Sequence, residues 1–463
     1  MPAYGHGFGM RYDLPLPLTL WIVGAACTIL LSFLIISIGV RANNPAAAPA
    51  QPSVLRWHID NGVTSVRIRL VVQLFAVAAL ILVVAAGLIG DQTPTRNLAP
   101  TAIWIAWWVG FSYLSAFVGN IWSVVNPWAA IFAWCERIVS IWRTPRRATV
   151  KWPENVGVWP GIALFLAFAW LELIWEGRSI PSQLAWLTIG FSVLTWTGML
   201  IFGRRTWLTH ADPFALAFGV LSKFAPTDIR IERGLGKDTL ILRPPGVGLV
   251  DDENVSRSLS VFVVVMLSTV TFDGLMATPL WQRLESALYV ALPMFGDSRL
   301  AIITTVALLV FCLIFIAVYR LVATLIARAS GNRMTPDAAS RAFVLTLVPI
   351  SIAYLLAHYL SYFLIQGQLL IRLVSDPFGF GWNTFGTAHF RPDIGIVDAR
   401  FVWYTSLVAI VLGHVAAVSL AHIVALRRFE DRRVAMRSQI PMLVLMIAYT
   451  MMSLWIIAQP IVE

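Results

Sequence analysis

Residues 70–90 read LVVQLFAVAALILVVAAGLIG, an apolar run without a charged side chain, and Arg67 and Arg69 stand just before it. A helix of about 20 apolar residues spans the roughly 30 Å hydrocarbon core of a bilayer. Because backbone groups in lipid must bond within their own segment, such a run predicts a membrane-spanning helix. The same pattern recurs along the chain and decides the fold class.

The overall composition agrees with a membrane protein. Hydrophobic residues make up 58% of the 463 residues, charged residues make up 13%, and the mean hydropathy is +0.76. A soluble core of this length cannot absorb so much apolar surface. The net charge of +10 does not predict nucleic-acid binding, because the arginines stand at the ends of apolar runs instead of forming a basic face.

The apolar runs predict an all-α integral membrane protein, organised as a single polytopic domain over residues 1–463, with the lipid bilayer as its surroundings. About ten transmembrane helices are expected, over residues 16–40, 70–90, 101–123, 157–175, 183–203, 258–276, 300–326, 342–366, 401–425 and 439–459.

Arginine distribution predicts the orientation of these helices. Alternate connections, over residues 41–69, 124–153 and 427–437, are rich in Lys and Arg, and the last of them carries five arginines. Basic loops stay on the cytoplasmic side. Both termini are therefore expected on the extracytoplasmic side, with a short outer tail over residues 1–15.

Two longer connections stand out. The inner loop 204–256 has mixed charge, and its Pro and Gly content argues against a domain of its own. The outer loop 367–400 contains Gln368, Asp376 and His389 among many polar groups, and loops of this length are often functional. Two interpretations of its Gly379–Asn383 stretch stay open, a lid folded over a cavity and a solvated Gly-rich turn.

A short internal echo appears between residues 122–129 (WSVVNPWA) and 207–215 (WLTHADPFA). Asn126 and Asp212 each precede a proline, and Asn or Asp before Pro is a typical helix start. The repeat is read as a helix-capping device, with an ancient duplication as the alternative.

Ionisable groups within apolar runs are functional candidates because burying them in lipid is costly. Asp273 and His358 are expected in outer halves of their helices, and His414 near the middle of its helix. Further candidates are Glu172 and His422 within spans, and His6 and Asp13 in the outer tail.

The histidines have two candidate roles, metal ligation and interhelical hydrogen bonding. His358, His389 and His414 are candidate ligands of a divalent transition metal, and interhelical hydrogen bonding is the alternative for each. His414 and His422 are eight residues apart, about 12 Å along a helix, so the two cannot share one ion. Phosphate-loop, HExxH and GxSxG signatures are absent from the sequence.

Several stretches resemble bacterial polytopic membrane proteins of the fenitrothion hydrolase family. Residues 6–17, which precede the first apolar run, read HGFGMRYDLPLP. Later stretches with the same resemblance are TFDG (271–274), AHYLS (357–361), QGQ (366–368), DPFG (376–379) with Trp382, GHV (413–415), AH (421–422) and SQIP (438–441).

The resemblance implies an enzyme of the bacterial cytoplasmic membrane that hydrolyses small apolar organophosphorus triesters and releases a nitrophenol. Asp273, His358 and His414 are then the candidate catalytic residues, with Asp273 as base or metal ligand. The helical membrane architecture, taken without the resemblance, favours a different class of protein, a transporter of a transition metal or a small apolar solute. A membrane subunit of a larger complex is the third interpretation.

Overall fold

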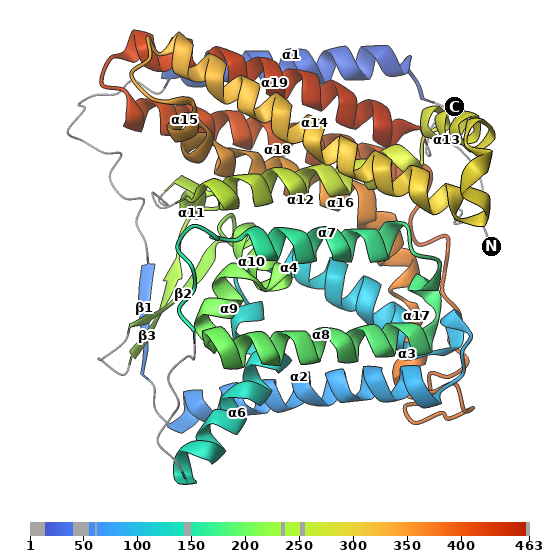
Figure 1. Ribbon diagram of the computed structural model, residues 1–463. Coiled ribbons are helices and arrows are strands. Elements are labelled where there is room, and N and C mark those ends of the chain that lie inside the picture. Colours follow the sequence, from blue (N-terminus) through green and yellow to red (C-terminus); the bar gives the residue numbers. More distant parts are fainter. Residues whose placement is uncertain are drawn as a thin grey trace. The chain divides into compact units, whose positions relative to one another are not determined.

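The computed structural model describes residues 14–39, 55–60, 63–142, 150–232, 237–250 and 255–459. They pack as two compact units, which are described separately (Figure 1). Unit 1 draws on residues 1–53, 245–361 and 397–463, and unit 2 on residues 54–244 and 362–396. The chain therefore passes from one unit to the other several times.

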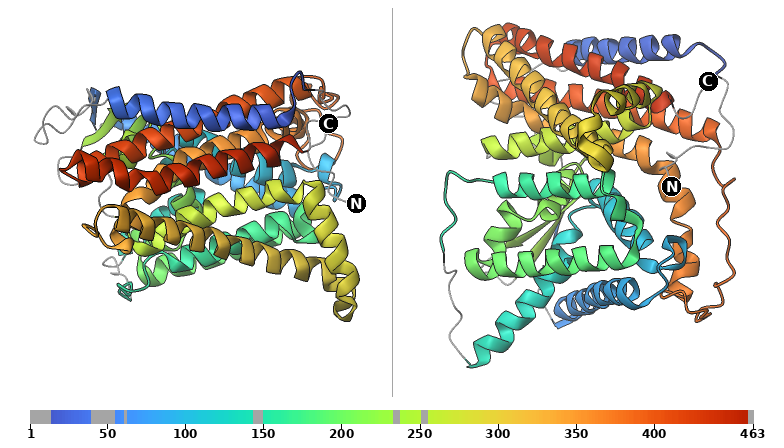
Figure 2. Two further views of the ribbon diagram at one scale, coloured as in Figure 1. Left: turned by 90° about the horizontal axis from the view of Figure 1, so that it is seen from above. Right: turned by 45° about the vertical axis from the view of Figure 1, so that its right-hand side comes forward.

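All regular secondary structure among the described residues of unit 1 is helical. Helix α19 packs against α1, α14 and α18, and α12 packs against α14 and α15; Figure 2 shows α1 beside α19 from two further directions. The Arg432 guanidinium donates a hydrogen bond of 2.6 Å to the backbone oxygen of Ser37 in α1. The elements are α1 (Leu18–Gly39), α11 (Val247–Val250), α12 (Arg257–Met276), α13 (Pro279–Ala291), η4 (Pro293–Ser298), α14 (Arg299–Ala329), α15 (Pro336–Phe343), η5 (Val344–Leu347), α16 (Val348–Gln366), α18 (Ala399–Arg428) and α19 (Arg432–Ala458).

Unit 2 combines helices with a small sheet. Helix α2 packs against α6 and α8, and α10 packs against α4 and α7. Its elements are β1 (Leu55–Asp60), α2 (Val63–Ile89), η1 (Pro94–Arg96), α3 (Leu98–Thr101), η2 (Ala102–Val109), α4 (Gly110–Phe117), α5 (Trp122–Val125), α6 (Pro127–Trp142), α7 (Trp159–Leu173), η3 (Glu176–Ser179), α8 (Pro181–Phe202), α9 (Arg204–His210), α10 (Pro213–Leu221), β2 (Thr227–Glu232), β3 (Lys237–Leu242) and α17 (Leu369–Ser375).

The helical membrane class is confirmed. Among the described residues, eight helices are long and apolar enough to cross a bilayer, and all eight coincide with predicted spans. The other two predicted spans differ from regular long helices. Residues 98–117 form α3, the π-helical segment η2 and α4 in succession, and α7 has only 15 residues. The number of crossings and the placement of the termini stay predictions.

The three-stranded sheet was not expected. Its order is β1-β3-β2 with both pairs antiparallel, and Leu242 of β3 stands opposite Leu55 on one side and Thr227 on the other. Strands β2 and β3 come from the predicted inner loop 204–256, and β1 from the preceding basic connection 41–69. Strands of six residues whose partners lie far away in sequence leave little local signal.

The predicted helix caps before the two prolines are confirmed. Asn126 Oδ1 accepts a hydrogen bond from the Ala129 amide at 3.0 Å, where α6 begins. Asp212 Oδ1 accepts from the amides of Phe214 and Ala215, both at 2.9 Å, where α10 begins. Each side chain supplies an acceptor for amides that the first helical turn leaves unpaired.

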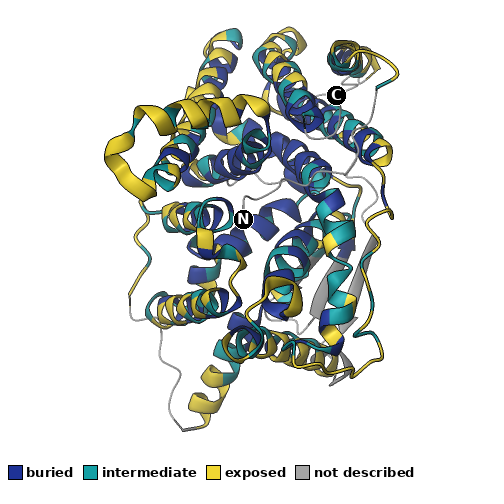
Figure 3. Cartoon of the chain, turned by 90° about the vertical axis from the view of Figure 1, so that its right-hand side faces the viewer, coloured by how far each residue is buried: buried dark blue, intermediate teal, exposed yellow. Residues whose placement is uncertain are grey.

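The eight spanning helices differ in burial. For α12 and for the helical run Pro336–Gln366, 72% and 83% of the apolar window is buried, against 50% or less in the other six. Figure 3 shows buried residues where helices face one another and exposed residues on their outer sides. A buried ionisable group on α12 or α16 therefore needs partners within the protein.

Candidate active site

Asp273 lies near the end of α12, the helix that carries the sequence TFDG. The side chain is 18% exposed, and His358 of α16 is 9% exposed. His358 Nε2 lies 2.8 Å from Asp273 Oδ2. A carboxylate and an imidazole at this distance share one proton-bearing hydrogen bond, and the tautomer of the ring decides which group donates.

Tyr359 binds the same carboxylate oxygen. Its hydroxyl donates to Asp273 Oδ2 at 2.7 Å, so two consecutive residues of α16 converge on one atom of α12. Hydrogen bonds to a charged acceptor are shorter and stronger than neutral ones. The two bonds fix the orientation of the Asp273 carboxylate.

Gly274 brings a further hydroxyl close to this group. A Cβ at this position would stand 2.1 Å from the hydroxyl oxygen of Tyr354, which lies one helical turn before His358. The rings of Tyr354 and His358 are 6.1 Å apart. Tyr354 Oη is buried and has no hydrogen-bond partner among the described residues. A buried hydroxyl without a partner is costly, because it has lost its hydrogen bonds to water.

A second group of polar side chains in unit 1 contains Thr271, His414 and Tyr449. The hydroxyls of Thr271 and Tyr449 are 2.5 Å apart, and the ring of Tyr449 is 5.7 Å from the ring of His414. His414 Nδ1 bonds to the backbone oxygen of Ile410 at 2.8 Å, whereas its buried Nε2 has no partner in the described part of the chain.

The structure thus brings together two of the predicted catalytic residues, Asp273 and His358. His414 lies in the same unit beside Tyr449. His422 pairs through Nδ1 with Gln439 Oε1 at 2.9 Å, which agrees with the interhelical alternative for that histidine.

The remaining predicted residues occupy other places. Glu172, at the end of α7, and His389, in the loop after α17, belong to unit 2. The Glu172 backbone oxygen accepts a hydrogen bond from Arg178 at 3.2 Å. His6 and Asp13 lie outside the described residues.

Gln368 and Asp376 organise the long loop 367–400. The Gln368 side chain bonds in both directions with the backbone of Asp393, each time at 2.9 Å. Asp376 accepts from the amides of Phe380 and Gly381 at 2.9 and 2.7 Å. Both residues therefore hold the loop backbone in shape.

The loop is also tied to its neighbour in unit 2. The Asp91 amide donates to Phe378 O at 2.7 Å, and the Arg372 guanidinium donates to Thr95 O at 2.7 Å. Hydrogen bonds of Asp91 with Thr93, more than the nearby Arg96 charge, lower the pKa of Asp91. These bonds give the Gly-rich stretch a defined conformation and leave the lid interpretation untested.

The predicted metal ligands are not assembled into one cluster. Among the described residues, no three His, Cys, Asp or Glu side chains are placed to hold a metal ion. His358 Nε2 bonds to Asp273, and metal ligation by the predicted histidines stays a prediction.

Tyr354, Tyr359, Thr271 and Tyr449 were not among the predicted site residues. The sequence did contain a signal, because Tyr354 lies one helical turn before His358 and Tyr359 follows His358 directly. Hydroxyls are common in apolar helices, however, and only the fold shows which of them meet a carboxylate.

No protein-family model matches this chain, and searches of curated proteins and of solved structures found no match either.

Proposed function

We propose that this protein is a hydrolase of the bacterial cytoplasmic membrane that cleaves small, uncharged organophosphorus triesters of the fenitrothion type. The observation that carries the proposal is the hydrogen bond between Asp273 and His358 in an apolar helical bundle. Such a pair can accept the proton of an attacking water. The resemblance of residues 271–274 and 357–361 to the fenitrothion hydrolase family supplies the substrate class.

The water oxygen attacks phosphorus, and the bond between phosphorus and the aryl oxygen breaks, so that its electron pair leaves with the nitrophenolate. The proton released by water passes to the Asp273–His358 pair and then to the phenolate. Tyr359 keeps the carboxylate oriented through its 2.7 Å bond. The products are a dialkyl phosphate or thiophosphate and a nitrophenol.

A membrane location suits this substrate class. An uncharged triester partitions into the hydrocarbon core, and a site between apolar helices meets it there at a high local concentration. The proposed steps use only side chains of this chain, and the metal content of active protein is measured separately.

Release of nitrophenol from fenitrothion, followed by absorbance, tests the proposal with protein in lipid nanodiscs. Asp273→Asn and His358→Gln should each lower kcat at least a hundredfold, the usual contribution of a positioned base. His210→Gln, a histidine of unit 2 that bonds only within its own helix among the described contacts, should retain activity. Metal content is measured on the same samples. Absence of turnover in folded, metal-replete wild type would overturn the proposal.

The second candidate is transport of a transition metal or a small apolar solute. Unit 1 buries His414 Nε2 and His422 Nε2 without partners in the described residues, and imidazole nitrogens are common ligands of transition metals. Zinc uptake into sealed proteoliposomes that contain a zinc-sensitive dye tests the metal version. Saturable uptake that His414→Phe abolishes would favour transport, whereas equal rates in empty liposomes would exclude zinc as the solute.

A further inference from the structure

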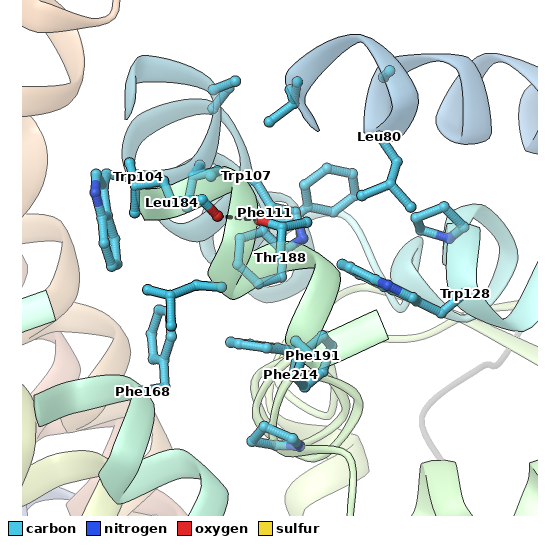
Figure 4. Close-up of a pocket in the computed structure, with 18 of the residues that line it drawn as sticks. Leu80, Trp104, Trp107, Phe111, Trp128, Phe168, Leu184, Thr188, Phe191 and Phe214 are labelled. Carbon is cyan, nitrogen blue, oxygen red and sulfur yellow. Dashed lines mark hydrogen bonds between the residues drawn. The ribbon is translucent and has the colours of Figure 1, made fainter. Parts of the chain in front are cut away.

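Unit 2 contains a large apolar cavity that the catalytic proposal does not use. Its volume is about 950 Å³, at the upper end of the usual range for small-molecule sites, and it is partly open to its surroundings. The walls come from α2, η2, α4, α5, α6, α7, α8 and α10; Figure 4 shows Trp107, Phe168 and Phe214 around the space. Of the described residues that line the cavity, none is charged.

The opening of the cavity lies among side chains of two helices that are long and apolar enough to cross a bilayer. Phe75 of α2 is 78% exposed and Trp186 of α8 is 64% exposed, although both residues line the cavity. Helix α2 is the least buried of the eight helices of this kind in the described residues. Exposed apolar surface on a spanning helix faces lipid, so the cavity opens toward hydrocarbon.

Polar groups of the wall are satisfied or inaccessible. The Thr188 hydroxyl donates to the backbone oxygen four residues earlier in α8 at 2.8 Å. The indoles of Trp104 and Trp128 donate to other oxygens of the protein at 2.8 and 2.7 Å. The indole nitrogens of Trp107 and Trp122 are buried and do not open into the cavity. The interior of the wall therefore offers a ligand apolar contact instead of hydrogen bonds.

Two helix starts at the cavity are apolar as well. Pro127 and Pro213, the first residues of α6 and α10, both line it. Proline has no backbone N–H. Asn126 and Asp212 accept hydrogen bonds from amides of the turn that follows. The repeated Asn/Asp-Pro motif thus removes amide donors that two helix starts would otherwise present to the cavity.

The cavity is about as long as one lipid leaflet is deep. Its lining extends from Gln183 to Leu194 along α8 and from Val72 to Val83 along α2, about 16 Å on each helix. Half of the roughly 30 Å hydrocarbon core has nearly the same depth. Gln183 lies with Trp175 at the end of the cavity where α8 begins. Tryptophan and polar side chains at the end of a spanning helix are typical of the headgroup level.

We propose that this cavity holds one acyl chain of a membrane phospholipid, which enters sideways from the bilayer and leaves its headgroup at the membrane surface near Gln183. The headgroup stays outside because its polar groups would lose their hydrogen bonds within the apolar wall. The acyl chain restores van der Waals contacts that an empty cavity would forfeit. The inference is independent of the hydrolase proposal, because Asp273 and His358 belong to unit 1.

Photocrosslinking of the full chain in nanodiscs tests the assignment. The nanodiscs contain phosphatidylethanolamine and phosphatidylglycerol, with a trace of phosphatidylglycerol that carries a diazirine in the middle of one acyl chain. Peptide mass spectrometry locates the attached lipid after illumination. Wild type should be labelled at Trp107 and Phe111 of the cavity wall, and also at the exposed Phe75.

Variants that fill the cavity locate the chain. Gly190→Trp and Ala167→Trp add a large side chain from two walls, α8 and α7. Each should lose the label at the two wall residues and keep the label at Phe75. Gly24→Trp in α1 is the matched control, because both glycines are exposed and neither has an atom within 4 Å of an added Cβ. This control should keep all three labels.

Native mass spectrometry of protein extracted in mild detergent identifies the occupant. Wild type should retain a molecule with the mass of a phospholipid, and Gly190→Trp should lose it. Three results would overturn the proposal: folded wild type without label at the wall residues, wall labels unchanged in both filled variants, or a retained molecule that is not a phospholipid.

Discussion

His358 Nε2 and Asp273 Oδ2 lie 2.8 Å apart although 85 positions separate the two residues in the sequence. The pair joins α12 to α16, the two most buried spanning segments. Both side chains are largely buried, so each depends on the other for compensation of its polarity.

Removal of both partners should therefore destabilise the protein by less than the sum of the two single removals. Asp273→Ala leaves His358 Nε2 without this partner, and His358→Ala leaves Asp273 with the Tyr359 hydroxyl, so each should lower the free energy of unfolding by about 1–3 kcal/mol. The double variant should cost clearly less than the sum. Unfolding by SDS titration measures these free energies. Strict additivity would show that the two side chains do not interact.

Gly274 should tolerate no side chain while Tyr354 keeps its hydroxyl. The added Cβ of Gly274→Ala would stand 2.1 Å from Tyr354 Oη and 3.0 Å from a methyl carbon of Ile456. We expect a loss of about 1–3 kcal/mol, as for other overpacked cores. Tyr354→Phe removes the nearest atom, so the double variant should recover part of the loss in the same titration. Equal losses in both backgrounds would contradict the contact.

Asp212 should make stability depend on pH. Burial raises the pKa of Asp212 to about 6, although two backbone hydrogen bonds act against this shift. The folded state then binds a proton more tightly than the unfolded state, so stability should rise as pH falls from about 6 to 4 and should be constant above 6. The full effect corresponds to about 3 kcal/mol.

Asp212→Asn isolates this effect because its amide oxygen can still cap α10. The variant should be more stable than wild type at pH 7.5, and the difference should shrink at pH 4.5. Asp212→Ala removes the cap as well, so its free energy of unfolding should be about 1–2 kcal/mol lower than that of Asp212→Asn. Thermal midpoints in detergent measure the series. Parallel curves for wild type and Asn at all pH values would contradict the shifted pKa.

Orientation in the membrane can be tested by labelling. Cys27, Cys135 and Cys312 are all free, so they are first replaced by Ala. An impermeant maleimide added to intact cells should then label Thr387→Cys in the outer loop and miss Ser140→Cys at the end of α6. The opposite pattern would place both termini on the cytoplasmic side.

The sequence predicted the helices well where an apolar run is long and unbroken, as in α12 and α18. It failed where the backbone departs from regular geometry, because the run 101–123 gives no local sign of the π-helical turn at Ala102–Val109. Asp273 and His358 were identified individually through the cost of burying ionisable groups. Their pairing, and the contribution of Tyr359, depend on how α12 and α16 pack, which a single sequence does not contain.

The contact between Ser37 and Arg432 can form only late in biosynthesis. The two residues are 395 positions apart, so a nascent α1 enters the bilayer long before α18 and α19 exist. Until then it is surrounded by lipid and must satisfy its own polar groups. The hydroxyls of Thr28, Ser32 and Ser37 each bond to a backbone oxygen four residues earlier in the same helix. α1 can therefore remain in lipid with these hydroxyl groups satisfied until α18 and α19 have been synthesised.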